Sequence, residues 1–456
     1  MTRELSCFKA YDIRGRVPAE LNLELVRQVG LAFAAEYAPR SVCLGRDMRL
    51  SSRDFALVLA NALEDGGVNV TDLGLCGTEE VYYATFSQGH DGGIMITASH
   101  NPADWNGLKL VREGARPLNS DNGLFAIRDR ILAGNLPIAQ KRGHTVRQDL
   151  RDEYCRFLLS LLGKEGGQNL APLRIVANAG NGCAWPVLEK LGAFLPCVLI
   201  PLHPTPDGSF PNGVPNPLLP EKRADTSAAV LKHRADLGLA WDGDFDRCFF
   251  FDEQGDFIES YYLIGLLAKN LLAAQPGARI IHDSRLIWNT RELVLEAGGI
   301  PVESKTGHAF MKERMRREVA LYGGEMSGHH YFRDFSHCDS GMLVWLLLYK
   351  LMSESGRKLS ELVGEGMRRY PVSGEINRRV ADAAACTEHI RRRYEKAARS
   401  VTWVDGLSMD MGQWRFNLRS SNTEPLLRLN VESRGDAGLM QEKCAGILRQ
   451  IAQFTD

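Results

Sequence analysis

The stretch from Gly93 to Lys109, which reads GIMITASHNPADWNGLK, places a serine at the end of a predicted buried strand. Asn101-Pro102 forces a turn directly after Ser99 and His100, and we expect Lys109 in the same loop region. The carboxyl end of a strand in an α/β fold opens toward the crevice where ligands bind, so we expect the Ser99 hydroxyl to be exposed. The serine of a hydrolase usually lies in G-x-S-x-G, which this stretch does not match. A turn that only caps the strand is the structural alternative.

A second stretch, LGLAWDGDFDRCFFFDEQG, concentrates carboxylates between two predicted strands. Asp242, Asp244 and Asp246 repel one another unless a cation lies among them, and hard oxygen ligands suit Mg²⁺. Arg247 occupies the position where an EF-hand loop requires glycine, and strands flank the loop, which argues against calcium. A solvated acidic turn is the structural alternative, but Trp241 and the apolar CFFF place the loop against a core. The three carboxylates, Arg247 and one Mg²⁺ are together neutral, which leaves a coordination position for an oxygen anion.

Two further loops offer groups that recognise sugar and phosphate. In YGGEMSGHHYF, Glu325, Ser327 and His329 provide acceptors, a hydroxyl and an imidazole for vicinal sugar hydroxyls, and we take His330 as structural. In RFNLRSSNTEPLLR, an arginine, hydroxyls and backbone N–H groups around a turn form a nest for phosphate. The residues of this nest are Arg419, Ser421, Asn422 and Thr423. The inventory also contains Lys305 and His308 in SKTGHAF and Tyr11 and Arg14 in YDIRG, each with an equally good structural reading.

Predicted strands and helices alternate through most of the chain. SVCLGRD and GGIMITAS are typical of short buried strands, and SSRDFALVLANALEDGG between them has apolar residues at helical spacing. The same pattern returns in LRIVANAGNGCAWPVLEKLG and in ARIIHDSRLIWNTRELVLEAGG. Such alternation predicts mostly parallel sheets covered by helices, with sites at the carboxyl ends of strands. After Tyr370, a charged helix in EHIRRRYEKAARS and a strand pair in GQWRFNLRSS and PLLRLNVESR predict a smaller α+β domain.

We therefore predict an α/β fold with three similar α/β domains, built on mixed or parallel sheets, and a smaller C-terminal α+β domain. The first domain spans 1–147 and carries the Ser99 loop, and the second spans 148–252 and carries the aspartate loop. The third spans 253–369 and carries the sugar loop, and the fourth spans 370–456 and carries the phosphate nest.

Composition excludes several classes of function. The chain has 456 residues and a formal net charge of −1, so it offers no general attraction to nucleic acid or to an anionic membrane. We find no secretion signal, no membrane span and no C-x-x-C pair among ten cysteines, and we expect a cytoplasmic protein with reduced thiols. NAGNG lacks the third glycine of a dinucleotide loop, and no P-loop motif for ATP occurs.

The four loops together resemble the α-D-phosphohexomutase superfamily, specifically its bacterial phosphomannomutase/phosphoglucomutase branch. TASHNP, DGDFDR, GEMSGHH and RSSNTEP occur in the order of that family, one in each predicted domain. The resemblance covers essentially the whole chain and implies four domains around a central cleft. One departure is Arg285 in HDSRL, where many members have lysine, so any contact carried over to this position is in doubt. A glucosamine-specific relative would typically have glutamine in place of Met326, which makes an amino sugar a poorer candidate substrate.

The resemblance also implies a role for each matching residue. Ser99 would carry the phosphoryl group, and Asp242, Asp244 and Asp246 would hold Mg²⁺ together with a phosphoserine oxygen of Ser99. Glu325 and Ser327 would bind sugar hydroxyls, and the nest of Arg419, Ser421, Asn422 and Thr423 would bind the phosphate that is not reacting. The other residues that would line the cleft are Tyr11, Arg14, His100, Lys109, Arg247, Lys305, His308 and His329.

The implied reaction interconverts hexose 6-phosphate and hexose 1-phosphate. A hexose 1,6-bisphosphate would be the intermediate and activator, and it would turn end over end between the two transfers. A base must take the proton of the sugar hydroxyl, and Lys109 and His329 are both candidates. We expect mannose phosphate as the favoured substrate and glucose phosphate as a second one, in the supply of nucleotide sugars. Phosphoglucomutase as the main activity, a sugar-phosphate phosphatase and a non-catalytic sugar-phosphate sensor are the alternatives. We expect sugar phosphates as the only partners of a monomer.

Overall fold

A computed structural model describes residues 5–420 and 426–455 of the chain, which divides into two compact units. The first unit comprises Met1–Phe257 and Gly328–Gly356, and the second comprises Ile258–Ser327 and Arg357–Asp456. The chain therefore leaves the first unit, builds part of the second and then returns before completing it.

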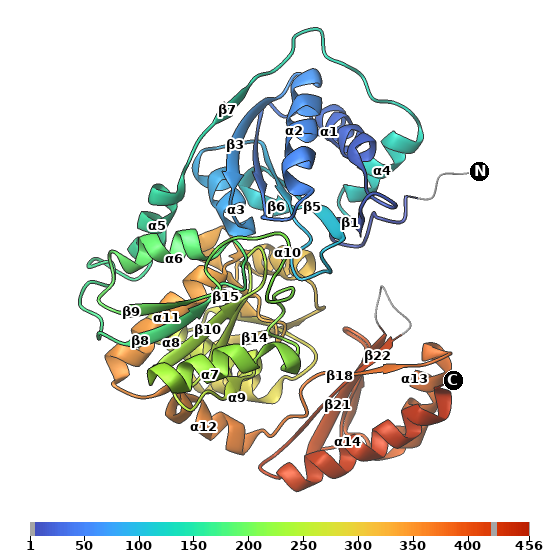
Figure 1. Ribbon diagram of the computed structural model, residues 1–456. Helices are drawn as coiled ribbons and strands as arrows, with labels where there is room; N and C mark the ends of the chain where they lie inside the picture. The colour runs from blue at the N-terminus through green and yellow to red at the C-terminus, as the bar shows by residue number, and fades with distance from the viewer. Residues whose placement is uncertain (1–4, 421–425, 456) are drawn as a thin grey trace. The chain divides into compact units, whose positions relative to one another are not determined.

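The first sheet of the first unit carries the Ser99 loop (Figure 1). Its strands are β1 (Ile13–Arg16), β2 (Ser41–Arg46), β3 (Asn69–Leu75), β4 (Gly92–Ile96), β5 (Trp105–Arg112), β6 (Arg116–Pro117) and β7 (Thr145–Arg147), and its helices are α1 (Leu23–Tyr37), α2 (Ser52–Asp65), α3 (Thr78–Ser87) and α4 (Leu124–Leu132). The order is β1-β5-β4-β2-β3-β7, with β4, β2, β3 and β7 parallel and β5 antiparallel to both neighbours. All five residues of β4 are buried, which explains why this strand is a continuous run of glycine and apolar residues.

The second sheet of the first unit carries the aspartate loop. Its strands are β8 (Arg174–Asn178), β9 (Val198–Leu202), β10 (Leu237–Trp241) and β11 (Cys248–Phe251), and its helices are α5 (Arg151–Ser160), α6 (Trp185–Gly192) and α7 (Ala224–His233). Strands β9, β8 and β10 are parallel, and β11 runs antiparallel to β10. The aspartate loop is thus the tight connection between two fully buried antiparallel strands. The short strand β12 (Phe257–Ile258) lies where the chain passes to the second unit.

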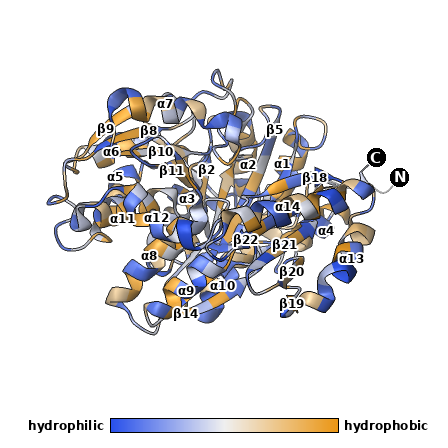
Figure 2. Ribbon diagram, turned by 90° about the horizontal axis from the view of Figure 1, so that it is seen from below, coloured by the Kyte–Doolittle hydropathy of each residue, from blue (hydrophilic) through white to orange (hydrophobic). Residues whose placement is uncertain are grey.

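The returning segment adds a hairpin and a long helix to the first unit. Strands β16 (His330–Phe332) and β17 (Cys338–Asp339) form the hairpin, and α11 (Gly341–Ser355) follows. The side chain of Ser340 caps α11 by accepting from Leu343 N at 2.9 Å, and it also donates to the buried carboxylate of Glu79 in α3. Most of α11 is apolar, as its orange colour in Figure 2 shows, and its residues from Gly341 to Leu346 are all buried. The hairpin is therefore held to the first sheet through the start of α11.

The second unit contains a parallel sheet and an antiparallel one. The parallel part consists of β13 (Arg279–Asp283), β14 (Ile300–Ser304) and β15 (Tyr322–Gly324), with helices α8 (Ser260–Ala274), α9 (Trp288–Glu296), α10 (His308–Glu318) and α12 (Leu359–Arg369). The C-terminal sheet has the order β18-β22-β21-β20-β19. Its elements are β18 (Ile376–Arg379), α13 (Ala383–Tyr394), β19 (Ser400–Thr402), β20 (Leu407–Asp410), β21 (Trp414–Ser420), β22 (Leu426–Ser433) and α14 (Ala437–Ile451).

Glu432 joins the two parts of the second unit. Its carboxylate, which is fully buried, accepts hydrogen bonds from Ile287 N at 2.8 Å and from Arg415 Nη1 at 2.8 Å. Arg415 in turn donates to the backbone oxygens of Ser284 and Arg285 after β13. This network fixes the loop that carries Arg285 against strand β22.

The predicted fold class is confirmed: the sheets of three α/β regions contain parallel strands covered by helices, and the C-terminal sheet is antiparallel. One predicted boundary is wrong. The charged helix ends at Tyr394 and not at Ser400, because a 3₁₀ turn follows and Ser400 pairs with Asp410 in the antiparallel sheet. The predicted domain boundaries stay predictions.

Candidate active site

Ser99 follows β4 in a left-handed backbone conformation with φ of 49°. This conformation costs a non-glycine residue roughly 1–2 kcal/mol, so the surroundings have to hold it. The Ser99 N–H donates to Thr97 Oγ1 at 2.8 Å, and the hydroxyl donates to Asp242 Oδ2 at 2.5 Å. The residue is only 3% exposed, so the expectation of an exposed hydroxyl is wrong. The hydroxyl is buried because it faces the aspartate loop of the neighbouring sheet.

The aspartate loop is fully buried as well. Asp242, Asp244 and Asp246 have no exposed surface, and each offers a carboxylate oxygen within 4.8 Å of the others. Thr78, the first residue of α3, donates its hydroxyl to Asp244 Oδ2 at 2.5 Å. The sequence thus brings three carboxylates to one point, and α3 and the Ser99 loop enclose them.

Two glycines allow this close approach. A Cβ at Gly243, between the first two aspartates, would lie 2.8 Å from the Ser99 carbonyl oxygen. A Cβ at Gly77, before α3, would lie 2.0 Å from the ring of Phe245, whose own φ is 50°. A larger side chain at Gly243 would push the aspartate loop away from the Ser99 loop. A larger side chain at Gly77 would push the Phe245 ring away from the start of α3.

Lys109 lies in strand β5 and not in the Ser99 loop, which corrects the sequence prediction. Its ammonium donates to Asp244 Oδ2 at 2.7 Å and to Asp246 Oδ2 at 2.5 Å. Burial by itself would lower the pKa of Lys109, but Asp244 and Asp246 outweigh it and raise that pKa above its usual value. Lys109 is therefore an ammonium that neutralises part of the buried negative charge.

The carboxylates are suited to a divalent cation. Oδ1 of Asp244 and Oδ1 of Asp246 are buried and have no hydrogen-bond donor among the described residues. Burial and the neighbouring Asp244 raise the pKa of Asp246 to about 6. For Asp244, burial is outweighed by the ammonium of Lys109, and its pKa lies below the usual value. Hard, clustered oxygen donors of this kind fit Mg²⁺.

Arg247 and His100 complete the surroundings of the Ser99 hydroxyl. Arg247 donates to Asp242 Oδ2 through Nε at 2.9 Å and Nη2 at 2.7 Å, and Nη2 also contacts His100 Nδ1. His100 Nδ1 lies 3.0 Å from Ser99 Oγ. Burial and the positive charge of Arg247 lower the pKa of His100 well below its usual value, so its imidazole is neutral. Arg14 in β1 donates to Asn101 Oδ1 at 2.7 Å, and Tyr11 lies just before β1.

His329, which directly precedes β16, approaches one of these carboxylates, that of Asp246. Its Nδ1 lies 2.8 Å from Asp339 Oδ2 and 3.9 Å from Asp246 Oδ1, and 14% of its side chain is exposed. His330 is fully buried in β16, and burial lowers its pKa to about 3. The sequence prediction that His330 is structural agrees with this burial.

The second unit brings the predicted sugar-binding residues close to one another. Glu325 directly follows β15, and its Oε1 accepts from Gly307 N at 2.8 Å. Lys305 follows β14 and His308 begins α10, so both lie within two residues of Gly307, which Glu325 contacts. Ser327 follows Glu325 in the same turn.

Arg419 lies in β21 and donates to Thr306 Oγ1 at 3.2 Å and to Glu375 Oε2 at 3.1 Å. Glu375 also pairs with Arg285 at 3.4 Å and with Arg428 at 3.5 Å. Burial of Glu375 is outweighed by Arg285 and the other two guanidinium groups, which lower its pKa. The other predicted members of the phosphate nest, Ser421, Asn422 and Thr423, lie outside the described residues.

The sequence reasoning did not identify Asp339 or Glu375. Asp339 stands in CDSG, and nothing in that stretch distinguishes it from an ordinary polar residue at a strand end. Glu375 stands in SGEIN, far in the sequence from Arg285 and Arg419. The one available signal for Glu375 is charge, since arginines need a carboxylate partner when they are buried.

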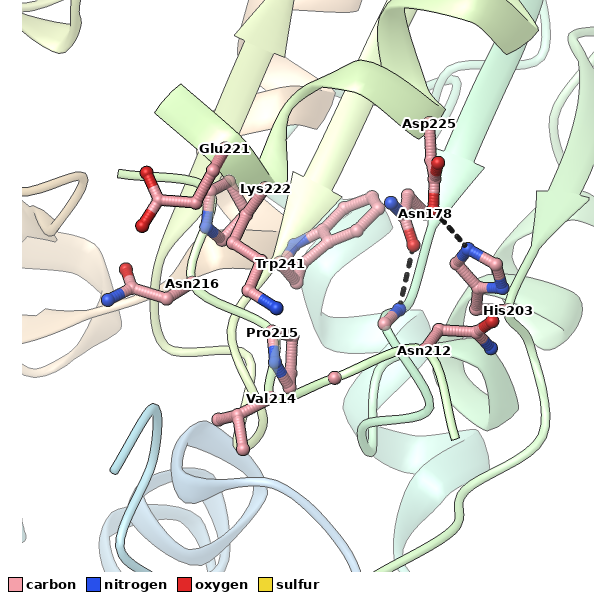
Figure 3. A pocket seen from close by; sticks show the side chains of 13 residues that line it. Asn178, His203, Asn212, Val214, Pro215, Asn216, Glu221, Lys222, Asp225 and Trp241 are labelled. Atoms are coloured by element: carbon pink, nitrogen blue, oxygen red, sulfur yellow. Dashed lines mark hydrogen bonds and ion pairs between the residues drawn. The ribbon is translucent and has the colours of Figure 1, made fainter. Parts of the chain in front are cut away.

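A separate cavity of about 110 Å³ lies at the carboxyl end of β8 (Figure 3). Asn178 ends β8, while Lys222 and Asp225 come from the segment around the start of α7, and His203 Nε2 lies 3.1 Å from Asp225 Oδ2. No residue predicted for catalysis is among those that line this cavity. The side chains that line this cavity carry charges of both signs, and we do not place the catalytic reaction there.

Within the two described ranges, 5–420 and 426–455, every helix is too short or too polar to cross a membrane. The predicted localisation stays a prediction.

Comparison with known proteins identifies the family. The alpha/beta/alpha domains I, II and III of phosphoglucomutase/phosphomannomutase match residues 6–136, 152–255 and 259–370, and the C-terminal domain of that family matches residues 375–449. A phosphomannomutase of Salmonella montevideo is 54% identical over 452 residues, which are 98% of each chain. A protein of Xanthomonas campestris named phosphohexose mutases is 54% identical over 96% of this chain and 97% of its own.

The fold has a counterpart among solved structures. The crystal structure of a phosphoglucomutase/phosphomannomutase family protein from Burkholderia thailandensis superposes with a TM-score of 0.88, at 31% identity and over 99% of both chains. Sequence and structure agree over the full length, and the chain therefore belongs to the phosphoglucomutase/phosphomannomutase family and is a phosphohexomutase.

Proposed function

We propose that this phosphohexomutase interconverts hexose 6-phosphate and hexose 1-phosphate by carrying the phosphoryl group on Ser99. The observation that supports this most directly is the 2.5 Å contact between Ser99 Oγ and Asp242 Oδ2 at a buried cluster of three aspartates. Burying three carboxylates costs free energy. Their position beside the Ser99 hydroxyl therefore favours a catalytic role for this hydroxyl. Relatives named phosphomannomutase support mannose as the preferred sugar, and the match to a phosphoglucomutase/phosphomannomutase family supports glucose as a second substrate.

The reaction consists of two phosphoryl transfers. A sugar hydroxyl attacks the phosphorus of phosphoserine 99, the bond between phosphorus and Ser99 Oγ breaks, and hexose 1,6-bisphosphate forms. After the bisphosphate turns around, Ser99 Oγ attacks its other phosphate and the second sugar hydroxyl leaves. Each transfer depends mainly on positioning and on stabilising charge, with little covalent work for other side chains.

Asp242, Asp244 and Asp246 would hold Mg²⁺, with an oxygen of the phosphorylated Ser99 as a further ligand. When bound, the cation stabilises the negative charge that the phosphoryl oxygens develop during transfer. Arg247 and Lys109 add two fixed positive charges beside the same carboxylates. A phosphoserine carries about −1.5 to −2 charge near neutral pH, so these cations are needed once Ser99 is modified.

We assign proton transfer to His329 in preference to Lys109. Lys109 is an ammonium that donates to Asp244 and Asp246, and it has no lone pair for a proton in this state. His329 has Nδ1 2.8 Å from Asp339 Oδ2, and a carboxylate there orients the ring so that Nε2 is the basic nitrogen. The neutral His100 contacts Ser99 Oγ and helps to place it.

The second unit would recognise the substrate. Glu325 and Ser327 would bind sugar hydroxyls, and Arg419 with Ser421, Asn422 and Thr423 would bind the phosphate that is not transferred. Lys305 and His308 would contact phosphate or hydroxyl groups of the same substrate, as would Tyr11 and Arg14 of the first unit. Since a hexose 1-phosphate is the usual donor for coupling to a nucleotide, the product would supply nucleotide-sugar synthesis.

A prediction on substrates separates this proposal from its alternatives. With Mg²⁺ and a trace of hexose 1,6-bisphosphate, mannose 1-phosphate and glucose 1-phosphate should both be converted to 6-phosphates, with mannose ahead by about tenfold or less in kcat/KM, about 1.4 kcal/mol. Enzyme-coupled assays of both 6-phosphates and of inorganic phosphate measure this. Free phosphate as the main product would indicate a phosphatase, and binding without turnover would indicate a sensor.

A second prediction concerns Ser99. Replacing Ser99 with Ala should lower kcat by roughly 10³-fold or more, because no other nucleophile replaces it. Mass spectrometry after incubation with hexose 1,6-bisphosphate should find phosphate on the peptide that contains Ser99 in the wild type only. Ser120→Ala, which removes a hydroxyl that donates to Asp121, serves as the control and should keep full activity. Substantial mutase activity in Ser99→Ala would refute the phosphoserine mechanism.

A third prediction concerns the metal. Asp244→Asn should lower kcat and raise the Mg²⁺ concentration needed for half-maximal rate, because an amide is a weaker ligand than a carboxylate. A titration of the rate against Mg²⁺ measures both effects. Asp252→Asn is a matched control, since Asp252 is a buried aspartate that follows β11 and accepts from the backbone N–H of Gln254. An unchanged Mg²⁺ titration in Asp244→Asn would exclude this loop as the metal site.

A fourth prediction distinguishes the two candidate bases. His329→Asn should lower kcat by about 10²–10⁴-fold and leave the Mg²⁺ titration unchanged, as expected for loss of an acid–base group. Lys109→Met should shift the Mg²⁺ titration, because it removes a charge that is bound to two of the metal's ligands. If His329→Asn retains wild-type kcat, proton transfer belongs to another residue.

A further inference from the structure

We propose that Arg49 is a positioning residue that holds the Ser99 loop in the geometry required for phosphoryl transfer. Arg49 lies between β2 and α2 and was not among the candidate residues. The inference rests on the proposed role of Ser99 and concerns how the fold keeps that serine in place.

The guanidinium group of Arg49 binds four backbone carbonyls between Ser99 and Trp105, the first residue of β5. Nη2 donates to the oxygens of Ser99 at 2.9 Å and Asn101 at 2.6 Å, and Nη1 donates to those of Pro102 at 2.7 Å and Trp105 at 2.9 Å. Four of its five N–H groups are thus used on the stretch that begins at the nucleophile itself. A loop has few backbone partners of its own, so these bonds replace the ladder that a strand would provide.

Arg49 is itself fixed in orientation. Its side chain is fully buried, its Nε lies 3.3 Å from Asp47 Oδ2, and its backbone N–H donates to Asp47 Oδ1 at 2.9 Å. Ser52 donates its hydroxyl to the same Asp47 oxygen at 2.6 Å. On its other side, the guanidinium carbon lies 5.2 Å from the centre of the Phe210 ring. The guanidinium group of Arg49 therefore has one orientation. Because its donors lie in a fixed plane, this orientation also fixes the positions of the loop carbonyls that it binds.

The Ser99 loop needs this support. Ser99 has φ of 49°, and its carbonyl faces Gly243 so closely that a Cβ there would lie 2.8 Å away. A shift of the loop would therefore change the 2.5 Å contact between Ser99 Oγ and Asp242. A displacement of about 1 Å at a reacting atom costs roughly 10²-fold in rate. Lysine cannot replace Arg49, because an ammonium has only three donors and no planar fork.

The chain offers a matched control. Arg223 also donates to two loop carbonyls, those of Pro217 at 3.0 Å and Leu218 at 2.7 Å, and its guanidinium carbon lies 3.4 Å from the centre of the Phe257 ring. It belongs to the same unit but contacts neither the Ser99 loop nor the aspartate loop through these bonds. The pair Arg49→Met and Arg223→Met thus removes the same kind of interaction with and without the link to Ser99.

The test measures kcat, KM and phosphorylation of Ser99 by hexose 1,6-bisphosphate in the full-length protein. For Arg49→Met and Arg49→Lys, kcat per folded molecule and the rate of Ser99 phosphorylation should fall by about 10²-fold, while KM for the sugar phosphate and the Mg²⁺ titration change by less than about threefold. Arg223→Met should lower thermal stability at most and leave kcat within twofold of wild type. If Arg49→Met does not fold, Arg49→Lys decides the question.

Three results would overturn the inference. These are wild-type kcat per folded molecule in the Arg49 variants, an equal loss in Arg223→Met, and a loss in Arg49→Lys that appears in KM alone. The Ser99→Ala variant is measured in parallel. Full activity in Ser99→Ala would refute the proposed function, whereas an inactive Ser99→Ala beside fully active Arg49 variants would refute only the role of Arg49.

Discussion

Burial of three carboxylates in one turn is the constraint on which the rest of the first unit depends. Asp242, Asp244 and Asp246 have no contact with solvent, and charges removed from water need partners. Lys109 pairs with Asp244 and Asp246, Arg247 pairs with Asp242, and the Ser99 hydroxyl also donates to Asp242. A bound Mg²⁺ and a phosphate on Ser99 would add charges of opposite sign. Binding of both together would therefore change the net charge of the site only slightly.

Close packing turns this charge arrangement into a fixed geometry. Gly243 lets the aspartate loop approach the Ser99 carbonyl, and Gly77 makes room for the ring of Phe245. Arg49 binds the carbonyls of the Ser99 loop from the other side. Ser99 is thus held between Gly243 on one side and the guanidinium group of Arg49 on the other, and its hydroxyl faces the carboxylates. Phosphoryl transfer relies on such positioning because the chemistry itself asks little of other side chains.

In the second unit, several positive charges are buried together and are neutralised by carboxylates. Arg285, Arg419 and Arg428 converge on Glu375, which neutralises part of their charge. Arg285 also pairs with Asp283 at 2.6 Å and lies 3.8 Å from Glu325. The planar guanidinium of Arg285 therefore contacts three carboxylates at once. This arrangement keeps Arg419 near Thr306 and the predicted sugar-binding loop.

The order of residues along the chain was enough to predict the secondary-structure elements and the kinds of chemistry. Strand and helix periodicity predicted the parallel sheets, and clustered aspartates predicted a metal loop, because periodicity and ligand type are local properties of the chain. Which side chains meet became evident from the three-dimensional fold alone. Lys109, expected in a loop, lies in β5 and reaches Asp244 and Asp246, Asp339 reaches His329 across a hairpin, and Arg49 reaches the Ser99 loop. These contacts depend on the order and direction of strands and on where each buried side chain points, and residues far apart in the sequence carry no local sign of such a meeting.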